Sequence, residues 1–315
     1  MRPGPQPRRI VLGIGDDAAA WRPSRSHLSV ISSDALVDGV HFRTRAMSGG
    51  EIGHRAMAAN LSDVAAMGAR PVLATVALGI PAAGDAPLVV EAYRAMAALA
   101  ARHGARIVGG DIVGAPVLFL SLTVVGEVSP SRLARRDGGR PGDVLAVTGP
   151  LGASRAGLAL LERDAPVGEA LARRAAEAFA RPEPRVAEGR WLAASRNVRA
   201  MVDLSDGLST DLGRLARASG CGAELLGVPI DPAAEAVARA LGDDPLEYAL
   251  DGGEDFELLV AVARRAFGHL AECFRAHFRK PLLGIGTLIA GSGVRLLGAG
   301  GTSRLLEPGG FEHLR

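Results

Sequence analysis

Residues 117–128 read VLFLSLTVVGEV, a run of twelve residues that is almost entirely apolar or β-branched. Such a run predicts a strand, and because apolar residues occupy both of its faces, we expect both faces to be covered. Around it, short β-branched runs alternate with longer Ala-rich stretches, which is typical of mixed α/β structure rather than of a sandwich or a helical bundle. The polar, turn-rich stretch that follows, residues 129–143, predicts a domain junction.

Hydrophobic periodicity and helix-breaking residues predict the remaining elements. In the first half we expect strands over 27–32, 72–78 and 106–108, and helices over 51–67 and 87–103. In the second half we expect strands over 144–147, 199–203, 223–228 and 256–262, Ala-rich helical stretches between 151 and 195, helices over 209–218 and 264–277, and two short closing strands. The chain is therefore predicted to be an α/β protein with two domains, residues 1–137 and 138–315.

The composition disfavours several classes of protein. Thirty-six basic residues against 34 acidic ones leave a net charge of +2, too small a surplus for a main role in binding nucleic acid. Lys280 is the only lysine and no G-x-x-x-x-G-K-[ST] motif occurs, so a P-loop is not expected. Cys221 and Cys273 form no C-x-x-C pair and no two histidines form H-E-x-x-H, which argues against disulfide and zinc sites. With no long apolar run and no signal peptide, we expect a cytoplasmic protein that does not span a membrane.

Aspartates, most of them next to Gly, Ser or another Asp, recur at predicted strand ends and loops. They are Asp16 and Asp17 in GIGDDAA, Asp34 in ISSDALVDGVHF, Asp63 in NLSDVAAMG, Asp111 in VGGDIVG, and Asp203, Asp206 and Asp211 in DLSDGLSTD. Taken singly, each is most simply a turn or helix-cap carboxylate. If they converge, two carboxylates about 4 Å apart repel by roughly 4 kcal/mol at an effective dielectric constant of 20, so cations must separate them.

A converging set of oxygen ligands favours Mg²⁺ or Ca²⁺ over zinc. Mg²⁺ usually combines one or two carboxylates with phosphate oxygens, so the pattern predicts a binding site for a polyphosphate nucleotide. Gly109, Gly110 and Gly207 would place backbone N–H groups near its oxygens. The alternative is that these aspartates lie on separate loops and never meet. Two further features each have two interpretations. Glu254 and Asp255, which precede a predicted strand, are either edge charges after a Gly-Gly turn or functional carboxylates. Arg136 is either a solvated linker residue or a residue that binds phosphate between the domains.

Seven blocks resemble, in order and approximate spacing, those of the thiamine-monophosphate kinase family of the aminoimidazole-ribonucleotide-synthetase-like superfamily. They are GIGDDAA, the SSDALVDGVHF block, NLSDVAAMGA, GGD, R-x-G-x-x-PGD from Arg136, DLSDGLSTDL and GGEDFELL. The resemblance implies an N-terminal α/β domain whose sheet pairs with that of a second subunit, a C-terminal α/β domain, and ATP in a cleft near the dimer interface. The likeness spans residues 13 to 259, which is most of the chain.

The resemblance also implies an activity: direct transfer of the γ-phosphoryl group of ATP to thiamine monophosphate, assisted by several Mg²⁺ ions. No catalytic side chain is assigned, because the acceptor phosphate is already ionised at neutral pH. The implied metal ligands are Asp17, with Asp16 beside it, Ser32 or Ser33, Asp34, Asp63, Asp111, Asp203 and Asp206. The implied nucleotide contacts are Gly110, Asp111, Arg136 and Ser205, and the implied contacts to thiamine phosphate are His41, Glu254 and Phe311.

The sequence departs from the family pattern in places, and rival functions remain. Few residues precede Gly13, and Ile112 and Val113 stand where relatives carry hydroxyl residues. Other enzymes of the superfamily are disfavoured, since a selenophosphate synthetase needs a reactive residue near the N-terminus and the hydrogenase-maturation relative ends in a cysteine. A nucleotide-binding or scaffold protein without catalytic activity stays a possible alternative.

Overall fold

The computed structural model describes residues 9–12, 14, 18–82, 84, 86–298 and 302–310. Asp16, Asp17 and Phe311 therefore lie outside the described residues. The chain divides into two compact units, the first comprising Met1–Val64 and Ala69–Leu133, the second Ala65–Gly68 and Ala134–Arg315. The functional division at residues 137 and 138 stays a prediction.

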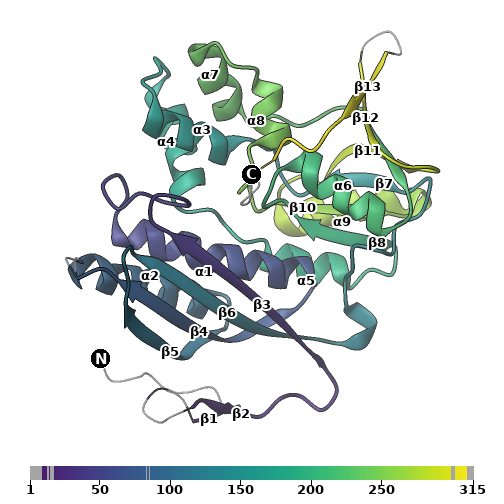
Figure 1. The fold of residues 1–315 in the computed structure, drawn as a ribbon. Coiled ribbons are helices and arrows are strands. Elements are labelled where there is room, and N and C mark those ends of the chain that lie inside the picture. Colours follow the sequence, from purple (N-terminus) through teal and green to yellow (C-terminus); the bar gives the residue numbers. More distant parts are fainter. Residues whose placement is uncertain are drawn as a thin grey trace. The chain divides into compact units, whose positions relative to one another are not determined.

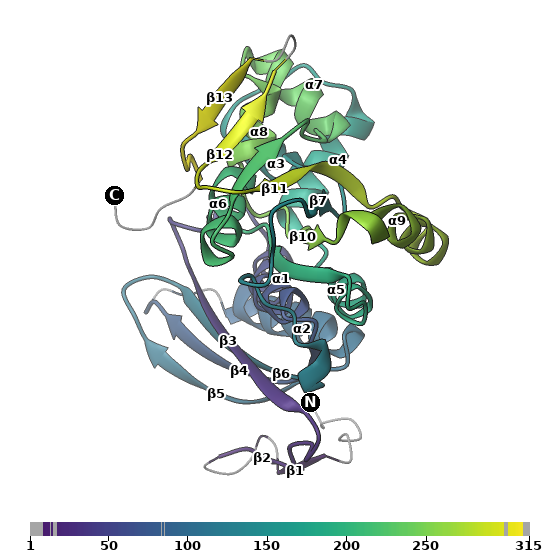
Figure 2. The same cartoon turned by 90° about the vertical axis from the view of Figure 1, so that its right-hand side faces the viewer.

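The first unit is a four-stranded sheet with helices on one face (Figures 1 and 2). Its elements are β1 (Ile10–Leu12), β2 (Ala20–Trp21), β3 (Leu28–Val37), α1 (Gly49–Ala66), β4 (Arg70–Ile80), α2 (Ala86–Arg102), β5 (Arg106–Gly114), β6 (Phe119–Val128) and the 3-10 helix η1 (Pro130–Arg132). The strand order is β3-β6-β4-β5, antiparallel except for the parallel pair β4 and β5, while β1 and β2 form a separate two-stranded ribbon.

The two helices predicted over 51–67 and 87–103 are confirmed as α1 and α2. A reciprocal cap starts α1, since the Ser48 N–H donates to Glu51 at 2.8 Å and the Glu51 N–H donates to the Ser48 hydroxyl at 3.3 Å. Along α2, the buried residues include Ala92, Met96 and Leu99, which recur at helical spacing. These apolar stripes cover one face of the sheet.

Within a single chain, only one face of the first half of β6 is covered. Leu120 and Leu122 are buried, but Phe119, Ser121 and Thr123 on the opposite face are partly exposed. Only farther along is this second face covered, where Ile10 and Trp21 of the β1–β2 ribbon pack on Val125. The two-residue alternation of a strand exposed on one side explains the pattern. We call the uncovered residues Ile31, Ser33, Phe119, Ser121 and Thr123 the open face.

The second unit is built around a seven-stranded sheet of order β13-β12-β9-β11-β7-β10-β8, in which only β12 and β9 are parallel. Its elements are β7 (Val144–Val147), α3 (Ala153–Glu162), α4 (Glu169–Ala180), α5 (Val186–Ala193), β8 (Val198–Asp203), α6 (Leu208–Ala218), β9 (Gly222–Leu225), α7 (Pro232–Leu241), α8 (Pro245–Asp251), β10 (Leu258–Val262), α9 (Arg264–Phe278), β11 (Leu283–Ile289), β12 (Val294–Leu297) and β13 (Ser303–Leu306). The helices α7 and α8 were not among the predicted elements. Of the helices in the described part of the chain, none has both the length and the apolar character that crossing a bilayer requires.

Candidate functional site

The first predicted ligands lie where β3 meets α1. Ser32 and Asp34 are two residues apart on β3, so their side chains share one face of the strand. The Ser32 hydroxyl donates a hydrogen bond to the Asp63 carboxylate on α1, which shows that this face is turned toward the helix. Ser33 points to the other side, where its hydroxyl donates to the Leu122 carbonyl oxygen at 3.0 Å. Two motifs that are distant in sequence thus place oxygen ligands side by side.

The predicted glycine of the GGD motif lies across the sheet from Asp34. A single register row runs from Asp34 through Leu122 and Val76 to Gly110. A Cβ atom at Gly110 would lie 1.9 Å from the Val76 carbonyl oxygen, so only glycine fits there. Asp111 occupies the next row and is exposed, with its carboxylate accepting a hydrogen bond of 2.9 Å from the Ile112 N–H.

The distance across the sheet limits which carboxylates can share an ion. Asp34 and Asp111 lie on opposite edge strands, which at a strand spacing of about 4.8 Å puts their backbones roughly 14 Å apart. Within the ranges that the structure describes, no three His, Cys, Asp or Glu side chains lie close enough together to hold a metal ion. Convergence of all the aspartates around shared cations therefore stays a prediction.

In the second unit, two loops bring three predicted site residues together. The loop of residues 203–207 follows β8, and the loop of residues 252–257 joins α8 to β10. The Glu254 N–H donates to the Ser205 carbonyl oxygen at 2.7 Å, and the Phe256 N–H donates to the Leu204 carbonyl oxygen at 3.0 Å. Ser205, Asp206 and Glu254 consequently belong to one surface, beside Asp203 at the buried end of β8.

Asp206 and Asp211 have different roles although they come from the same motif. Asp206 forms an ion pair with Arg214, and both side chains stay partly exposed. Asp211 is buried, accepts a hydrogen bond of 3.0 Å from the Asp206 N–H and also contacts Arg214 at 3.0 Å. Burial, together with the charge of Asp206, raises the pKa of Asp211 to about 6. Asp211 is thus a structural carboxylate that shapes the loop carrying Asp206.

The last described residues of the chain pack against this loop. The Gly309 N–H donates to the Ser209 hydroxyl and the Gly310 N–H to the Thr210 hydroxyl, each at 3.2 Å. A Cβ atom at Gly310 would lie 1.9 Å from the carbonyl oxygen of Asp206, so the approach requires glycine. Phe311 follows directly in sequence, and its contact with substrate stays a prediction.

Two further predicted residues are placed singly. His41 accepts a hydrogen bond at Nδ1 from the Val37 N–H at 3.0 Å, so its neutral ring carries the proton on Nε2. Arg136 is exposed, while its carbonyl oxygen accepts a hydrogen bond of 2.8 Å from the Ser219 hydroxyl. That bond holds the backbone of the polar junction against the second unit.

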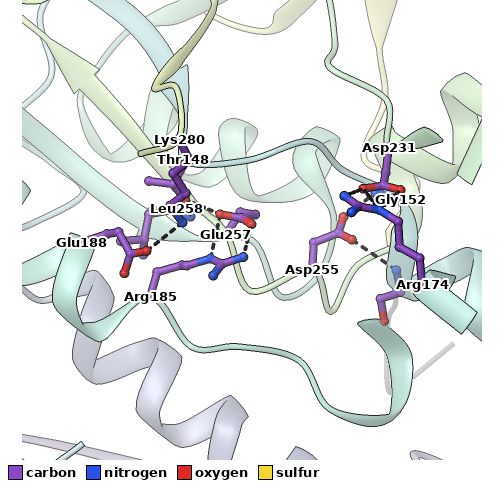
Figure 3. A network of polar contacts seen from close by, with 11 residues as sticks. Thr148, Gly152, Arg174, Arg185, Glu188, Asp231, Asp255, Glu257, Leu258 and Lys280 are labelled. Atoms are coloured by element: carbon purple, nitrogen blue, oxygen red, sulfur yellow. Dashed lines mark hydrogen bonds and ion pairs between the residues drawn. The ribbon is translucent and has the colours of Figure 1, made fainter. Parts of the chain in front are cut away.

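The sequence analysis missed a cavity of about 440 Å³ in the second unit, near the start of α3. Figure 3 shows the charged residues around it. Their ion pairs are Arg174 with Asp231, Arg185 with Glu257 at 2.6 Å, and Lys280 with Glu188 at 2.7 Å. Asp255 also lines the cavity, and its carboxylate accepts a hydrogen bond of 2.8 Å from the Gly152 N–H. Asp255 and Glu257 belong to the GGEDFELL block that the sequence singled out, whereas Arg174, Arg185 and Glu188 lie in stretches that resemble ordinary solvated helices.

Comparisons with known proteins agree on one family. Residues 15–128 match the family described as "AIR synthase related protein, N-terminal domain", and residues 140–298 match the corresponding C-terminal domain. The thiamine-monophosphate kinase of Rhodopirellula baltica is 40% identical over 266 residues, covering 81% of this chain and 77% of that protein.

Solved structures give the same result. The thiamine-monophosphate kinase of Stenotrophomonas maltophilia K279a has a TM-score of 0.83 at 35% identity, over 92% of this chain and 91% of that chain. AaThiL complexed with AMPPCP and TMP has a TM-score of 0.82 at 30% identity, over 93% and 89%. The two-domain fold and the family expected from the sequence motifs are both confirmed, and the chain belongs to the thiamine-monophosphate kinase family.

Proposed function

We propose that this protein transfers the γ-phosphoryl group of ATP to thiamine monophosphate, producing thiamine diphosphate and ADP. The observation that carries the proposal is the likeness, over nearly the whole chain, to AaThiL in complex with AMPPCP and TMP. The chain keeps oxygen ligands and glycine-bounded loops in both units, as a reaction between two phosphorylated molecules requires. Such a reaction depends on positioning and charge neutralisation rather than on a covalent nucleophile, which agrees with the absence of an assigned catalytic side chain.

Mg²⁺ is the cation that these ligands suit best. The proposed ligands Asp17, Ser32, Ser33, Asp34, Asp63, Asp111, Asp203 and Asp206 offer only oxygen atoms, and hard divalent cations prefer oxygen. When bound, Mg²⁺ neutralises charge on the phosphate groups. The contact between Ser32 and Asp63 supports a pair of metal ligands on the face of β3 that carries Ser32 and Asp34. The partly exposed carboxylate of Asp206 supports a second metal position.

The nucleotide and the acceptor take different residues in this proposal. Gly110, Asp111, Arg136 and Ser205 bind ATP, and the exposed guanidinium of Arg136 suits a phosphate oxygen. His41, Glu254 and Phe311 bind thiamine monophosphate. In the neutral form of His41, the Nε2–H is a donor that a phosphate oxygen can accept.

The same proposal includes a homodimer that pairs the N-terminal sheets. Two observations support it: the open face is apolar in part, with Ile31 at 66% exposure, and Asp34 and Asp111 lie on opposite edges of one sheet. A second copy placed on the open face would supply its own Asp111 near this unit. Sedimentation at micromolar concentration should show a dimer, whereas a monomer would contradict this part of the proposal. The cytoplasmic location stays a prediction.

The test of the activity is direct. We expect the wild-type protein, incubated with Mg²⁺, ATP and thiamine monophosphate, to form thiamine diphosphate. Asp206→Asn should lower kcat/KM by at least about 100-fold, because it removes a ligand charge beside the reacting phosphates. Asp243→Asn is the matched control, since Asp243 is also paired with an arginine, Arg163, but lies outside the proposed site. Tight binding of ATP without product would instead identify a nucleotide-binding protein without catalytic activity.

A further inference from the structure

The loop that carries Glu254 has an unusual backbone. Glu254 and Phe256 have φ angles of 53° and 49°, the left-handed region that residues with a side chain rarely adopt. Each such residue is strained and persists only where its surroundings enforce it. Gly253 precedes them at φ 66°, where a Cβ atom would lie 2.7 Å from the Ser205 carbonyl oxygen. Contacts elsewhere in the second unit must therefore hold this turn in place.

Asp255, which lies between the two left-handed residues, makes such a contact. Its carboxylate accepts hydrogen bonds from the N–H groups of Gly152 at 2.8 Å and Ser154 at 3.4 Å, at the start of α3. Figure 3 shows the side chain reaching from the loop to Gly152. The first N–H groups of a helix have no partner inside the helix, so a carboxylate there is well satisfied. Asp255, at the centre of the turn, thus binds the turn to the start of α3.

Glu257 fastens the same loop at its end. It is 5% exposed, is paired with Arg185 through two hydrogen bonds of 2.6 and 3.0 Å, and accepts a further bond from Thr148. The Asp255 and Glu257 side chains therefore bind residues that line the cavity or lie beside it. Glu254 instead donates its backbone N–H to the Ser205 carbonyl oxygen. The loop is therefore anchored through the Asp255 and Glu257 side chains, and the Glu254 N–H joins it to the loop that carries Ser205.

We propose that Asp255 is a positioning residue: by binding the start of α3 it holds the turn of residues 252–256 in its left-handed conformation and so places Glu254 against the loop of residues 203–207. Its effect on the substrate rests on the proposed function, in which Glu254 binds thiamine monophosphate. The anchoring itself does not depend on that function and can be tested without activity.

The experiment compares three variants of the full-length protein. Asp255→Ala removes both acceptor oxygens, whereas Asp255→Asn keeps one of them for the Gly152 N–H. Asp143→Ala is the matched control, because the buried Asp143 carboxylate likewise accepts a backbone N–H bond, of 2.9 Å from Arg140, and pairs with Arg199, but lies at the other end of the β7–β10 pair. Hydrogen exchange of the Glu254 and Phe256 amides and steady-state kinetics are measured below the unfolding temperature of every variant.

We expect Asp255→Ala to speed exchange at the Glu254 and Phe256 amides by about 10-fold, because their bonds to the neighbouring loop loosen. It should raise the KM for thiamine monophosphate by about 10-fold but the KM for ATP by less than about 3-fold. Asp255→Asn should restore both quantities to within about 3-fold of wild type. Asp143→Ala should leave the exchange of these amides and the ratio of the two KM values unchanged.

Unchanged exchange in Asp255→Ala, or an equal change in Asp143→Ala, would overturn the proposal. If Asp255→Ala does not fold, Asp255→Ser replaces it, since the shorter side chain withdraws the oxygen from Gly152 while leaving a polar group in place. A wild-type protein without turnover would sink the proposed function alone, because the exchange measurements still decide whether Asp255 anchors the turn.

Discussion

The buried carboxyl group of Asp255 should make the stability of this protein depend on pH. Burial raises the pKa of Asp255 to about 7, against the stabilising bonds from Gly152 and Ser154, and the charges of Glu257 and Asp231 raise it further. Because the folded pKa lies above the unfolded value of 3.8, the group contributes most to stability below pH 4 and loses that contribution as the pH rises to 7.

The magnitude follows from the shift. At about 1.4 kcal/mol per pKa unit, a rise from 3.8 to about 7 corresponds to at most about 4 kcal/mol, and solvent screening of this partly exposed residue lowers the limit. Roughly 2–3 kcal/mol of it should be lost between pH 5 and pH 8. Asp255→Asn does not titrate and keeps the bond to α3, so it should lack this loss.

The assay is denaturant unfolding of the wild type and of Asp255→Asn at several pH values from 5 to 8. Subtracting the two curves removes the titration of all other groups, provided that they are unchanged in the variant. The free energy of unfolding of the wild type should fall relative to the variant as the pH rises. A difference that stays constant to within about 0.5 kcal/mol over this range would refute the reasoning, because the carboxyl would then titrate as it does in the unfolded chain.

Three other substitutions test the architecture and the nucleotide site. Gly110→Ala should destabilise the first unit by about 3 kcal/mol or more in denaturant unfolding, because a Cβ atom would overlap the backbone of β4, whereas Gly114→Ala, with open space around it, should cost under about 1 kcal/mol. Arg136→Ala should raise the KM for ATP more than that for thiamine monophosphate, and an equal rise in both would remove Arg136 from the nucleotide side. Glu127→Gln should lower the free energy of unfolding by about 2 kcal/mol, because Glu127 is buried and paired with Arg9. Burial alone would raise the pKa of Glu127, but the contact with Arg9 lowers it overall. An unchanged unfolding midpoint would show that this ion pair is not stabilising.

The sequence predicted most elements but misjudged those whose limits depend on neighbours. The strand predicted over 106–108 continues to Gly114 in the structure. Gly109 and Gly110 are typical of a loop, so the prediction ended before them. Pairing with β4 keeps them in the strand. The helices α7 and α8 were missed although each begins with an Asp-Pro pair, Asp231-Pro232 and Asp244-Pro245, in which the aspartate caps the helix. That local signal was present in the sequence and would have located both helices.

The site was predictable in its chemistry and only partly in its geometry. Ser32 and Asp63 are distant in sequence yet in contact, and Ser205 and Glu254 are joined through the backbone. The role of Asp255 could not be read from GGEDFELL. Whether a carboxylate faces a substrate or a helix terminus depends on the left-handed backbone of its neighbours, and such conformations depend on tertiary contacts rather than on the local sequence.

Asp206 and Asp211 differ in burial and in hydrogen bonding although they come from the same motif, DLSDGLSTD. Asp211 is enclosed and accepts a backbone N–H bond, so replacing that bond with a metal ion would leave the N–H group unpaired at a cost of about 1–3 kcal/mol. Asp206 is paired with Arg214 while both remain partly exposed, and an ion pair of this kind contributes only about 0–1 kcal/mol. A divalent cation would therefore displace Arg214 from Asp206 at little cost, which supports the proposal of Asp206, and not of Asp211, as a ligand.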